Sequence, residues 1–280
     1  MKNIIYYFSI LFGILTLASC DPNQDGNGDF LIGVDYDPST GGTGTTSSRQ
    51  LKQLTSHLKD EDTGQYEDAN YTYTYTANKL TSYKDDTGEV TKFDYNSSNK
   101  ISKMSGTGQT SVFEYSGANL FKVITEITGA AKITATYSFT GGKLSKIISI
   151  QEFTIPFPVK AYYETTYEFS GENLTKSIIK NGVYNPVTGE LEMTPETQTV
   201  SFTYDAKKSP YKLLPQEYNL CLIGIAPQGG NYLSANNSEK VTIYNSGTSA
   251  EVTTFSHIYD SENYPTKSTA GADYITYKYQ

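Results

Sequence analysis

One short pattern recurs along this chain of 280 residues: an aromatic, a polar and a second aromatic residue, followed by a polar turn and then Leu or Ile. The stretch 137–144 shows it as Tyr-Ser-Phe, Thr-Gly-Gly-Lys and Leu, and the stretch 167–174 repeats it as Tyr-Glu-Phe, Ser-Gly-Glu-Asn and Leu. The second aromatic residues of successive copies are Tyr75, Tyr95, Tyr115, Phe139, Phe169, Tyr204 and Tyr259. A unit repeated this often constrains the fold more than any other feature of the sequence.

Each copy of the pattern predicts a β-hairpin. The stretch 71–76 alternates Tyr and Thr, which is the two-residue period of a strand and not the period of a helix. Aromatic and β-branched residues suit a pleated surface, and the Gly and Asn residues of the turns tolerate positive φ. Because one hairpin is marginal alone, the copies must share a sheet. We therefore predict an all-β, antiparallel up-and-down meander of about a dozen or more strands, strongly curved or closed but soluble.

The alternation also predicts which face of each first strand is apolar, with Tyr71, Tyr73 and Tyr75 on one side and threonines on the other. The second strands are less regular, so their buried face stays open, and a β-bulge is one explanation. A transmembrane barrel is the competing interpretation. It would need uncharged lipid-facing positions, because a Lys or Arg at mid-membrane costs roughly 2–4 kcal/mol. If the sheet closes with more than about ten strands, it leaves internal space, which could be a tyrosine-lined cavity.

The N-terminus predicts an export signal. Residues 4–17 are largely apolar but too short for a membrane span, which needs about 20 residues. The following Ala18, Ser19 and Cys20 resemble the lipobox of bacterial lipoproteins, in which Cys20 would receive acyl chains such as palmitate. An ordinary signal peptide with an accidental cysteine is the alternative. We predict a signal peptide over 1–19, lipidated Cys20 with a flexible tether over 20–48, and a single β-meander domain over 49–280.

Residues 205–240 interrupt the repeat. They contain three prolines and the most apolar run after the signal, with the second cysteine, Cys221, inside it. This composition predicts a short helical or irregular insertion near 210–235. It would be either a plug or lid over a cavity or a hydrophobic cap that protects the sheet. The cap is the simpler interpretation, with Cys221 buried as a small apolar residue.

The remaining residues give little sign of catalysis. The formal net charge of −8 argues against nucleic acid and against charge-driven binding to anionic lipid. His57 and His257 lie in no metal-ligand spacing, and no nucleophile, phosphate-loop or dinucleotide motif is present. Two partial calcium-loop patterns, at 21–26 and 60–64, are more typical of a solvated tether and a turn. We predict no enzyme activity, no catalytic residue, no metal and no cofactor.

Aromatic composition leaves one binding hypothesis. The chain has 25 Tyr and no Trp, and tyrosine rings can stack on sugars. The candidate ligand-contacting residues are Tyr71, Tyr73, Tyr75, Tyr137 and Tyr167. The alternative is that these rings build the core of the sheet, in which case they offer no binding surface.

The hairpin corners, the stretch 232–237 and the closing stretch 259–267 resemble a family of Bacteroidetes lipoproteins of unknown function with a porin-like β fold (domain of unknown function 4595). They also distantly resemble YD-repeat hairpins. The likeness covers about residues 49–280, although Asn263 stands where the family commonly has Gly. The resemblance implies the porin-like fold and no known substrate or catalytic residue.

We therefore expect a lipoprotein of the outer membrane, at the cell surface or on the periplasmic face. Its expected role is non-enzymatic binding or scaffolding, and the alternative is a glycan-binding accessory protein. The expected partners are the membrane, through the lipid anchor, and a polysaccharide or an envelope protein, but not nucleic acid.

Overall fold

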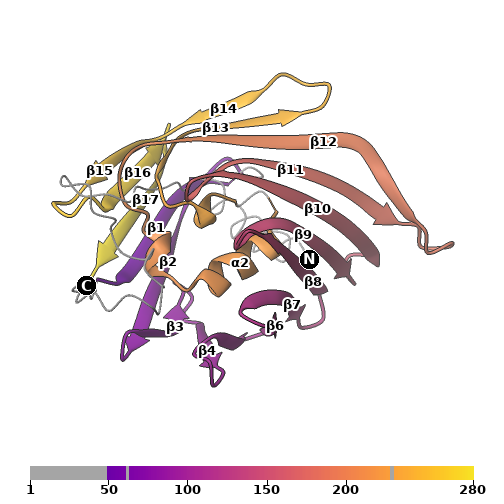
Figure 1. Cartoon of the computed structure of the whole chain (residues 1–280), viewed down its shortest axis with the longest axis horizontal. Coiled ribbons are helices and arrows are strands. Elements are labelled where there is room, and N and C mark those ends of the chain that lie inside the picture. Colours follow the sequence, from indigo (N-terminus) through magenta and orange to yellow (C-terminus); the bar gives the residue numbers. More distant parts are fainter. Residues whose placement is uncertain (1–48, 61–62, 228–229) are drawn as a thin grey trace.

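The structure, a computed structural model, describes residues 49–60, 63–227 and 230–280. Seventeen strands form one antiparallel sheet that curls round three helical segments (Figure 1). The strands are β1 (Leu51–Lys59), β2 (Tyr66–Thr76), β3 (Lys79–Lys84), β4 (Val90–Tyr95), β5 (Ile101–Gly106), β6 (Gln109–Ser116), β7 (Asn119–Ile127), β8 (Ala131–Thr140), β9 (Lys143–Phe153), β10 (Val159–Ser170), β11 (Asn173–Tyr184), β12 (Leu191–Tyr204), β13 (Ser238–Asn245), β14 (Glu251–Thr254), β15 (Ser256–Tyr259), β16 (Pro265–Ala270) and β17 (Asp273–Tyr279). The helical segments are η1 (Tyr211–Leu213), α2 (Gln216–Ile225) and η2 (Gly230–Leu233).

The sheet is a nearly closed barrel. Successive strands pair from β1 to β14, and β1 also pairs with the last strand, β17, which brings the two ends of the sheet together. β14 pairs with β13, whereas β15 pairs with β16, and the single residue Phe255 joins β14 to β15. This confirms the predicted antiparallel meander.

The repeated pattern forms the hairpin corners. Six copies join consecutive strands, whereas the copy that ends at Tyr204 leads from β12 into the helical segments. Two turns show how the sequence permits this: Gly141 and Gly142 have φ of 59° and 78°, and Asn263 has φ of 66°. Asn tolerates the left-handed conformation better than most residues other than Gly, which explains why it can replace Gly at that corner.

Each corner also carries a β-bulge opposite the second aromatic residue, where the pairing register shifts. In β9, for example, Ser138 pairs with Lys146 and Phe139 with Leu144, so Ser145 is the extra residue. The Ser145 hydroxyl donates a hydrogen bond of 3.0 Å to the Ser138 carbonyl. Equivalent bonds from the extra residue close three other corners, at Thr81, Thr175 and Thr266.

The bulge corrects the simple two-residue alternation of the second strands. In β9, Leu144 faces inward, but the extra residue shifts the phase, so that Ile147 and not Lys146 or Ile148 is buried next. A β-bulge inserts one residue into the strand and so moves every later side chain to the opposite face. The irregular second strands are therefore a consequence of the corner itself.

Tyrosine hydroxyls tie neighbouring corners together. Tyr75 donates to the carbonyl of Leu51 at 2.9 Å, Tyr95 to that of Leu80 at 2.8 Å, and Tyr115 to that of Ile101 at 2.6 Å. The acceptor is each time the carbonyl of a buried Leu or Ile at the start of the strand immediately before the tyrosine's own, in β1, β3 and β5. Tyr204 and Tyr279 make the same kind of bond to Leu174 and Pro265. The pattern thus encodes both a turn and a link to the preceding hairpin.

The predicted insertion is an internal plug. The described residues of the segment between β12 and β13 enter the inside of the barrel, and α2 lies within the curl of the sheet (Figure 1). Seven of the ten residues of α2 are buried. The helix packs on β7, β8 and β9, and η2 packs on β11. The barrel therefore has its core between the plug and the inner face of the sheet.

Candidate functional site

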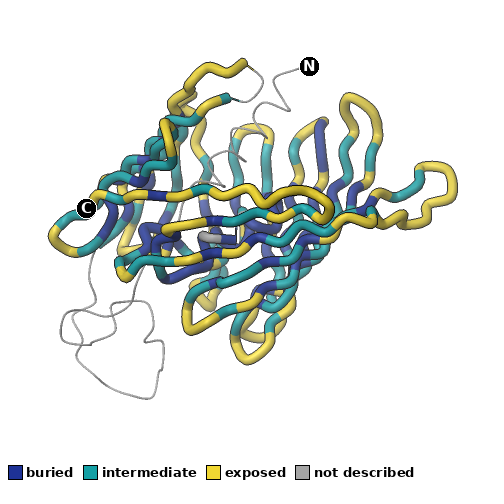
Figure 2. Tube along the Cα trace, turned by 90° about the horizontal axis from the view of Figure 1, so that it is seen from above, coloured by how far each residue is buried: buried dark blue, intermediate teal, exposed yellow. Residues whose placement is uncertain are grey.

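The barrel has two rims of different construction. The corner rim holds the repeat-encoded turns, both ends of the plug, and the first and last described residues, where the backbones of Gln50 and Gln280 exchange two hydrogen bonds. The loop rim, at the opposite ends of the strands, holds the remaining connections, among them 154–158, 185–190 and 246–250. Figure 2 shows exposed backbone concentrated at the tips of the hairpins and buried backbone between the two rims.

The structure places the five predicted ligand-contacting tyrosines on the inner face of the barrel. Tyr73, Tyr137 and Tyr167 are 6%, 4% and 7% exposed, and Tyr71 and Tyr75 are half-buried against the same core. The Tyr137 hydroxyl donates to the carbonyl of Leu220 in the plug at 2.9 Å. These rings come from strands around the barrel and meet the plug, so in this arrangement they offer little surface on which a sugar could stack.

Burial changes the acid–base chemistry of this interior. It raises the pKa of Tyr73 and of Tyr137 far above the usual tyrosine range, because the charged phenolate would be desolvated. Burial also raises the pKa of the Cys221 thiol to about 11, against the opposing effect of hydrogen bonds from Ser111 and Thr125. A thiol with a raised pKa and no exposure is a weak nucleophile, which agrees with Cys221 acting as a small apolar core residue.

Both a polar side chain and close packing hold the plug in place. The side-chain amide of Gln151 on β9 donates to the carbonyl of Ile225, at the end of α2, at 2.9 Å. Gly224 lies against β8 so closely that an added Cβ would be 2.3 Å from the Tyr137 hydroxyl and 2.8 Å from the Ala135 Cβ. Both contacts require the helix to be fully seated, so the plug is part of the core.

A small cavity remains beside the plug. Its lining residues are Thr91, Met104, Gly106, Gln109 and Ser111, and its volume is about 10 Å³. This is enough for about one water molecule and far below the several hundred cubic ångströms of a typical ligand site.

The outer wall of the barrel is charged. Five Lys–Glu pairs span neighbouring strands between β6 and β11, with N–O distances from 2.7 to 4.0 Å: Lys122–Glu114, Lys132–Glu126, Lys146–Glu164, Lys160–Glu152 and Lys176–Glu168. Lys146 and Glu164 lie well inside β9 and β10, where a barrel that spanned a bilayer would face hydrocarbon, and such charges are costly there. The wall is instead suited to water.

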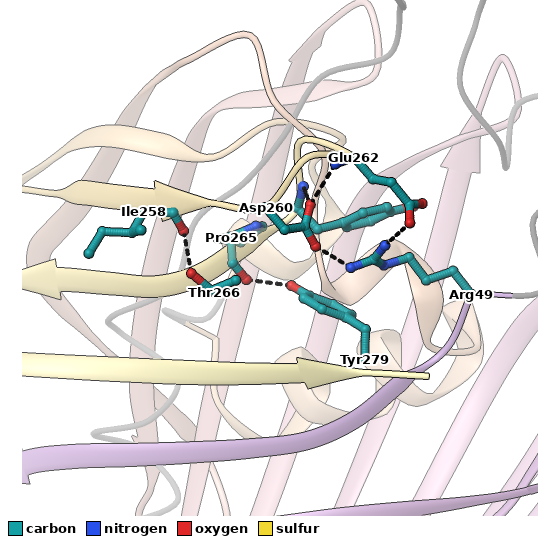
Figure 3. Close-up of polar contacts among 8 residues, drawn as sticks. Arg49, Ile258, Asp260, Glu262, Pro265, Thr266 and Tyr279 are labelled. Carbon is teal, nitrogen blue, oxygen red and sulfur yellow. Dashed lines mark hydrogen bonds and ion pairs between the residues drawn. The ribbon is translucent and has the colours of Figure 1, made fainter.

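Arg49 fastens the beginning of the described chain to the corner rim. Its guanidinium forms ion pairs with Asp260 and Glu262 at the β15–β16 corner (Figure 3). It also lies 4.5 Å from the centroid of the Tyr279 ring and 4.8 Å from that of the Tyr264 ring. Arg49 was not among the predicted site residues, although it is the single arginine among 22 basic residues, which is a signal that the sequence carries.

Exposed apolar side chains gather at the loop rim. Eleven of the thirteen large apolar residues that are exposed among the described residues lie in the halves of strands nearest that rim or in its loops. Six belong to the neighbouring loops 154–158 and 185–190 and the strand ends beside the second loop: Ile155, Phe157, Val183, Val187, Leu191 and Met193. Sequence periodicity did not identify this group, because its members lie in and beside irregular loops.

The other predicted positions give no site. His57 stacks between Tyr66 and Tyr274 and contacts Asp68 at 2.6 Å, while His257 contacts Ser268 at 2.9 Å on a different part of the barrel. The described residues contain no group of three or more His, Cys, Asp or Glu arranged to hold a metal ion. Within the same part of the chain, no helix is long and apolar enough to cross a membrane.

Several predictions lie wholly or partly outside the described residues. These are the signal peptide over 1–19, lipidation of Cys20, the tether and the first partial calcium pattern; the second pattern includes residues 61 and 62, which are also outside.

Comparison with known proteins gives a likeness of fold. No protein-family model matches the sequence, and no curated protein matches it. A porin-like protein from Bacteroides vulgatus ATCC 8482 matches at 12% identity and a TM-score of 0.41, covering 82% of this chain and 98% of that chain. A porin-like protein from Bacteroides uniformis ATCC 8492 matches at 13% identity and a TM-score of 0.40, covering 81% and 96%. At these values we draw nothing about activity from either protein.

Proposed function

We propose that this chain is an outer-membrane lipoprotein, anchored through Cys20, whose barrel is a non-enzymatic binding or scaffold domain and not a channel. The observation that carries this proposal is the charged outer wall, because an ion pair such as Lys146–Glu164, well inside β9 and β10, suits water and not hydrocarbon. The plug supports it further, since α2 occupies the interior through which a pore would run. The anchor itself is supported by the lipobox-like residues 17–20 alone.

The position of Arg49 supports an orientation for this domain. The tether joins the chain at residue 48, next to Arg49, and Arg49 is fastened to the corner rim. An anchor at Cys20 therefore attaches to the barrel at the corner rim, and the loop rim is the end of the barrel farther from the attachment point. In this arrangement the exposed apolar side chains of the loop rim are the part of the barrel best placed to meet an envelope protein.

Polysaccharide remains the alternative partner for the proposed binding role. It would need a surface other than the five inward-facing tyrosines, three of which are buried. Retardation of the protein in a native gel that contains a polysaccharide would support this alternative. Loss of retardation in Tyr73→Ala would not count as evidence for a sugar contact, because that substitution also damages the core.

The anchoring proposal is tested by feeding cells an alkyne analogue of palmitate and comparing the full chain with its Cys20→Ala and Cys221→Ala variants. We expect label on the full chain and on Cys221→Ala, and none on Cys20→Ala. The labelled proteins should be in the outer-membrane fraction. Protease added to intact cells then separates the cell surface from the periplasmic face. An unlabelled full chain, or label that persists in Cys20→Ala, would contradict the anchor, and single-channel currents from the purified protein in planar bilayers would contradict the non-channel role.

A further inference from the structure

The β11–β12 hairpin extends beyond the body of the barrel. Its loop, 185–190, lies at the right margin of Figure 1, past the end of β10. Exposure follows from this position: Val187 at the tip is 91% exposed, and Val183 and Met193, on opposite faces of the hairpin, are each 45% exposed. A hairpin that is solvent-exposed on both faces is not supported by the plug, so its exposed residues contribute little to the core.

One edge of this hairpin is open. β12 pairs with β13 from Gln198 onward, and Thr197 and Ser246 close that ladder with hydrogen bonds of 3.0 and 3.1 Å. Over Leu191–Thr194, the ladders of the described residues join β12 to β11 only. Alternate residues of such an edge present backbone N–H and C=O groups to the outside, which is the chemistry that accepts another strand. Pro195, which has no N–H, ends the open stretch.

An apolar row on the outer wall leads to this edge. Ile150, Tyr162, Gly182 and Met193 are paired in turn across β9, β10, β11 and β12 and therefore share one face. Gly182 lets the last two strands approach closely, because an added Cβ there would lie 3.0 Å from the Met193 sulfur. The row stops at Met193, and no strand of the described structure pairs with β12 there on its other side, so an added strand would continue the row with an apolar side chain.

Charge indicates what kind of strand fits. Glu190, Glu192 and Glu196 are exposed on and beside the open stretch, and the nearest exposed cation on β11 is Lys180. A second copy of this edge would bring Glu192 close to another Glu192, and like charges directly opposite each other destabilise a strand pair. A basic strand would instead be attracted. The edge therefore discriminates against self-pairing and in favour of a partner with Lys or Arg between its apolar residues.

We propose that the open edge of β12 over Leu191–Thr194 is a docking site for an extended segment of another protein, with alternating apolar and basic side chains, which adds to the barrel as a further strand. Its apolar side chains continue the row that ends at Met193, and its cations pair with the glutamates of the edge. The docking site adds a class of partner to the proposed binding role. It rests on the proposed function only in that the loop rim faces away from the membrane anchor. Backbone hydrogen bonds supply the affinity, and the side chains supply the selectivity.

The test uses the full chain, purified in a mild detergent, and a fluorescent peptide of alternating Val and Lys. We expect binding by fluorescence anisotropy and, in the same complex, slower amide hydrogen exchange over 191–194. The same peptide methylated on its backbone nitrogens should not bind, because it cannot form the ladder. Met193→Lys should weaken binding by about tenfold or more. Val112→Lys, which alters an apolar residue of similar exposure on β6, a strand paired on both sides, should leave binding unchanged.

A charge exchange separates strand addition from simple adhesion. Glu192→Lys should lose the Val/Lys peptide and gain a Val/Glu peptide. Absence of peptide binding, equal binding of the methylated peptide, or slow exchange of the outward-facing amides of 191–194 in the free chain would overturn the proposal. Concentration-dependent dimers that are lost in Met193→Lys would assign the edge to a second copy instead. None of these outcomes depends on the lipid. If the labelling experiment contradicts the anchor, the docking site is unaffected. If the peptide experiment contradicts the docking site, the anchor is unaffected.

Discussion

The corner rim and the loop rim are built from the same strands but follow different rules. At the corner rim, hairpins carry the same bulge, and tyrosines such as Tyr95 bond to a backbone carbonyl of the preceding hairpin. At the loop rim the connections differ in length, and apolar side chains such as Phe157 and Val187 face solvent. One rim holds the barrel together, while the other is free to vary. The difference teaches that the repeat encodes the corners and the links between them, whereas the opposite end, where we propose recognition, follows no repeat.

The largest effect is expected from alkaline pH, because burial raises the pKa of Tyr73, Tyr137 and Cys221 in the interior and of Tyr95 at the corner rim, the last to about 12. A raised folded-state pKa gives stability that is present below the unfolded pKa, about 10 for Tyr, and is lost as pH rises toward the folded value. We expect cooperative unfolding above about pH 10, with tyrosinate absorbance and circular dichroism changing together. Complete ionisation of the tyrosines with the sheet intact would contradict this.

Removing a core contact between plug and barrel should have the next largest effect. Ile223 is 0% exposed on α2, so Ile223→Ala leaves a cavity and should lower the free energy of unfolding by about 2–5 kcal/mol. Val187→Ala, at the loop rim, removes a side chain that is 91% exposed and should change it by less than about 0.5 kcal/mol. Chemical denaturation measures both. Equal costs for the two changes would mean that the plug is a removable lid and not part of the core.

The link between Arg49 and the corner rim should be of intermediate strength. Arg49→Met keeps an apolar stem but removes two ion pairs and the stacking on Tyr264 and Tyr279, and we expect a loss of about 1–2 kcal/mol. The backbone bonds between Gln50 and Gln280 should then exchange their hydrogens faster, which mass spectrometry detects. Arg49→Lys should restore only part of the protection, since Lys lacks the planar fork that reaches two carboxylates.

The smallest effect is expected from a single tyrosine clamp. Tyr115→Phe keeps the ring but removes the hydrogen bond of 2.6 Å to Ile101 and should cost about 0.5–1.5 kcal/mol. The copies that end in Phe139 and Phe169 have no hydroxyl at this position, so the fold tolerates the change. If Tyr115→Phe is neutral in denaturation, the corner rim is held by its bulges and turns, and the tyrosine clamps are dispensable.

Much of the fold followed from the sequence because the signal is local. A turn with Gly or Asn at positive φ, as at Gly141 and Gly142, needs no distant partner to be recognised, and neither does the alternation of 71–76. The insertion near 210–235 was also recognisable from its prolines and apolar run. The site residues were harder to predict, because an inward aromatic face and a solvent-facing one have the same two-residue period. Tyr73, Tyr137 and Tyr167 fit a binding surface by pattern, and only the position of α2 shows that they are buried.

The sequence by itself determined the class of the fold, the up-and-down order of its strands and the places where the chain turns, because those properties depend on neighbouring residues. Only the tertiary structure decided where the plug lies, which face of each second strand is buried after its bulge, and that Arg49 meets Asp260 more than two hundred residues away. The tertiary structure also left the edge at Leu191–Thr194 open, because β13 ends its pairing at Gln198. These outcomes depend on contacts between distant segments. A local stretch of sequence does not determine the free energies of such contacts.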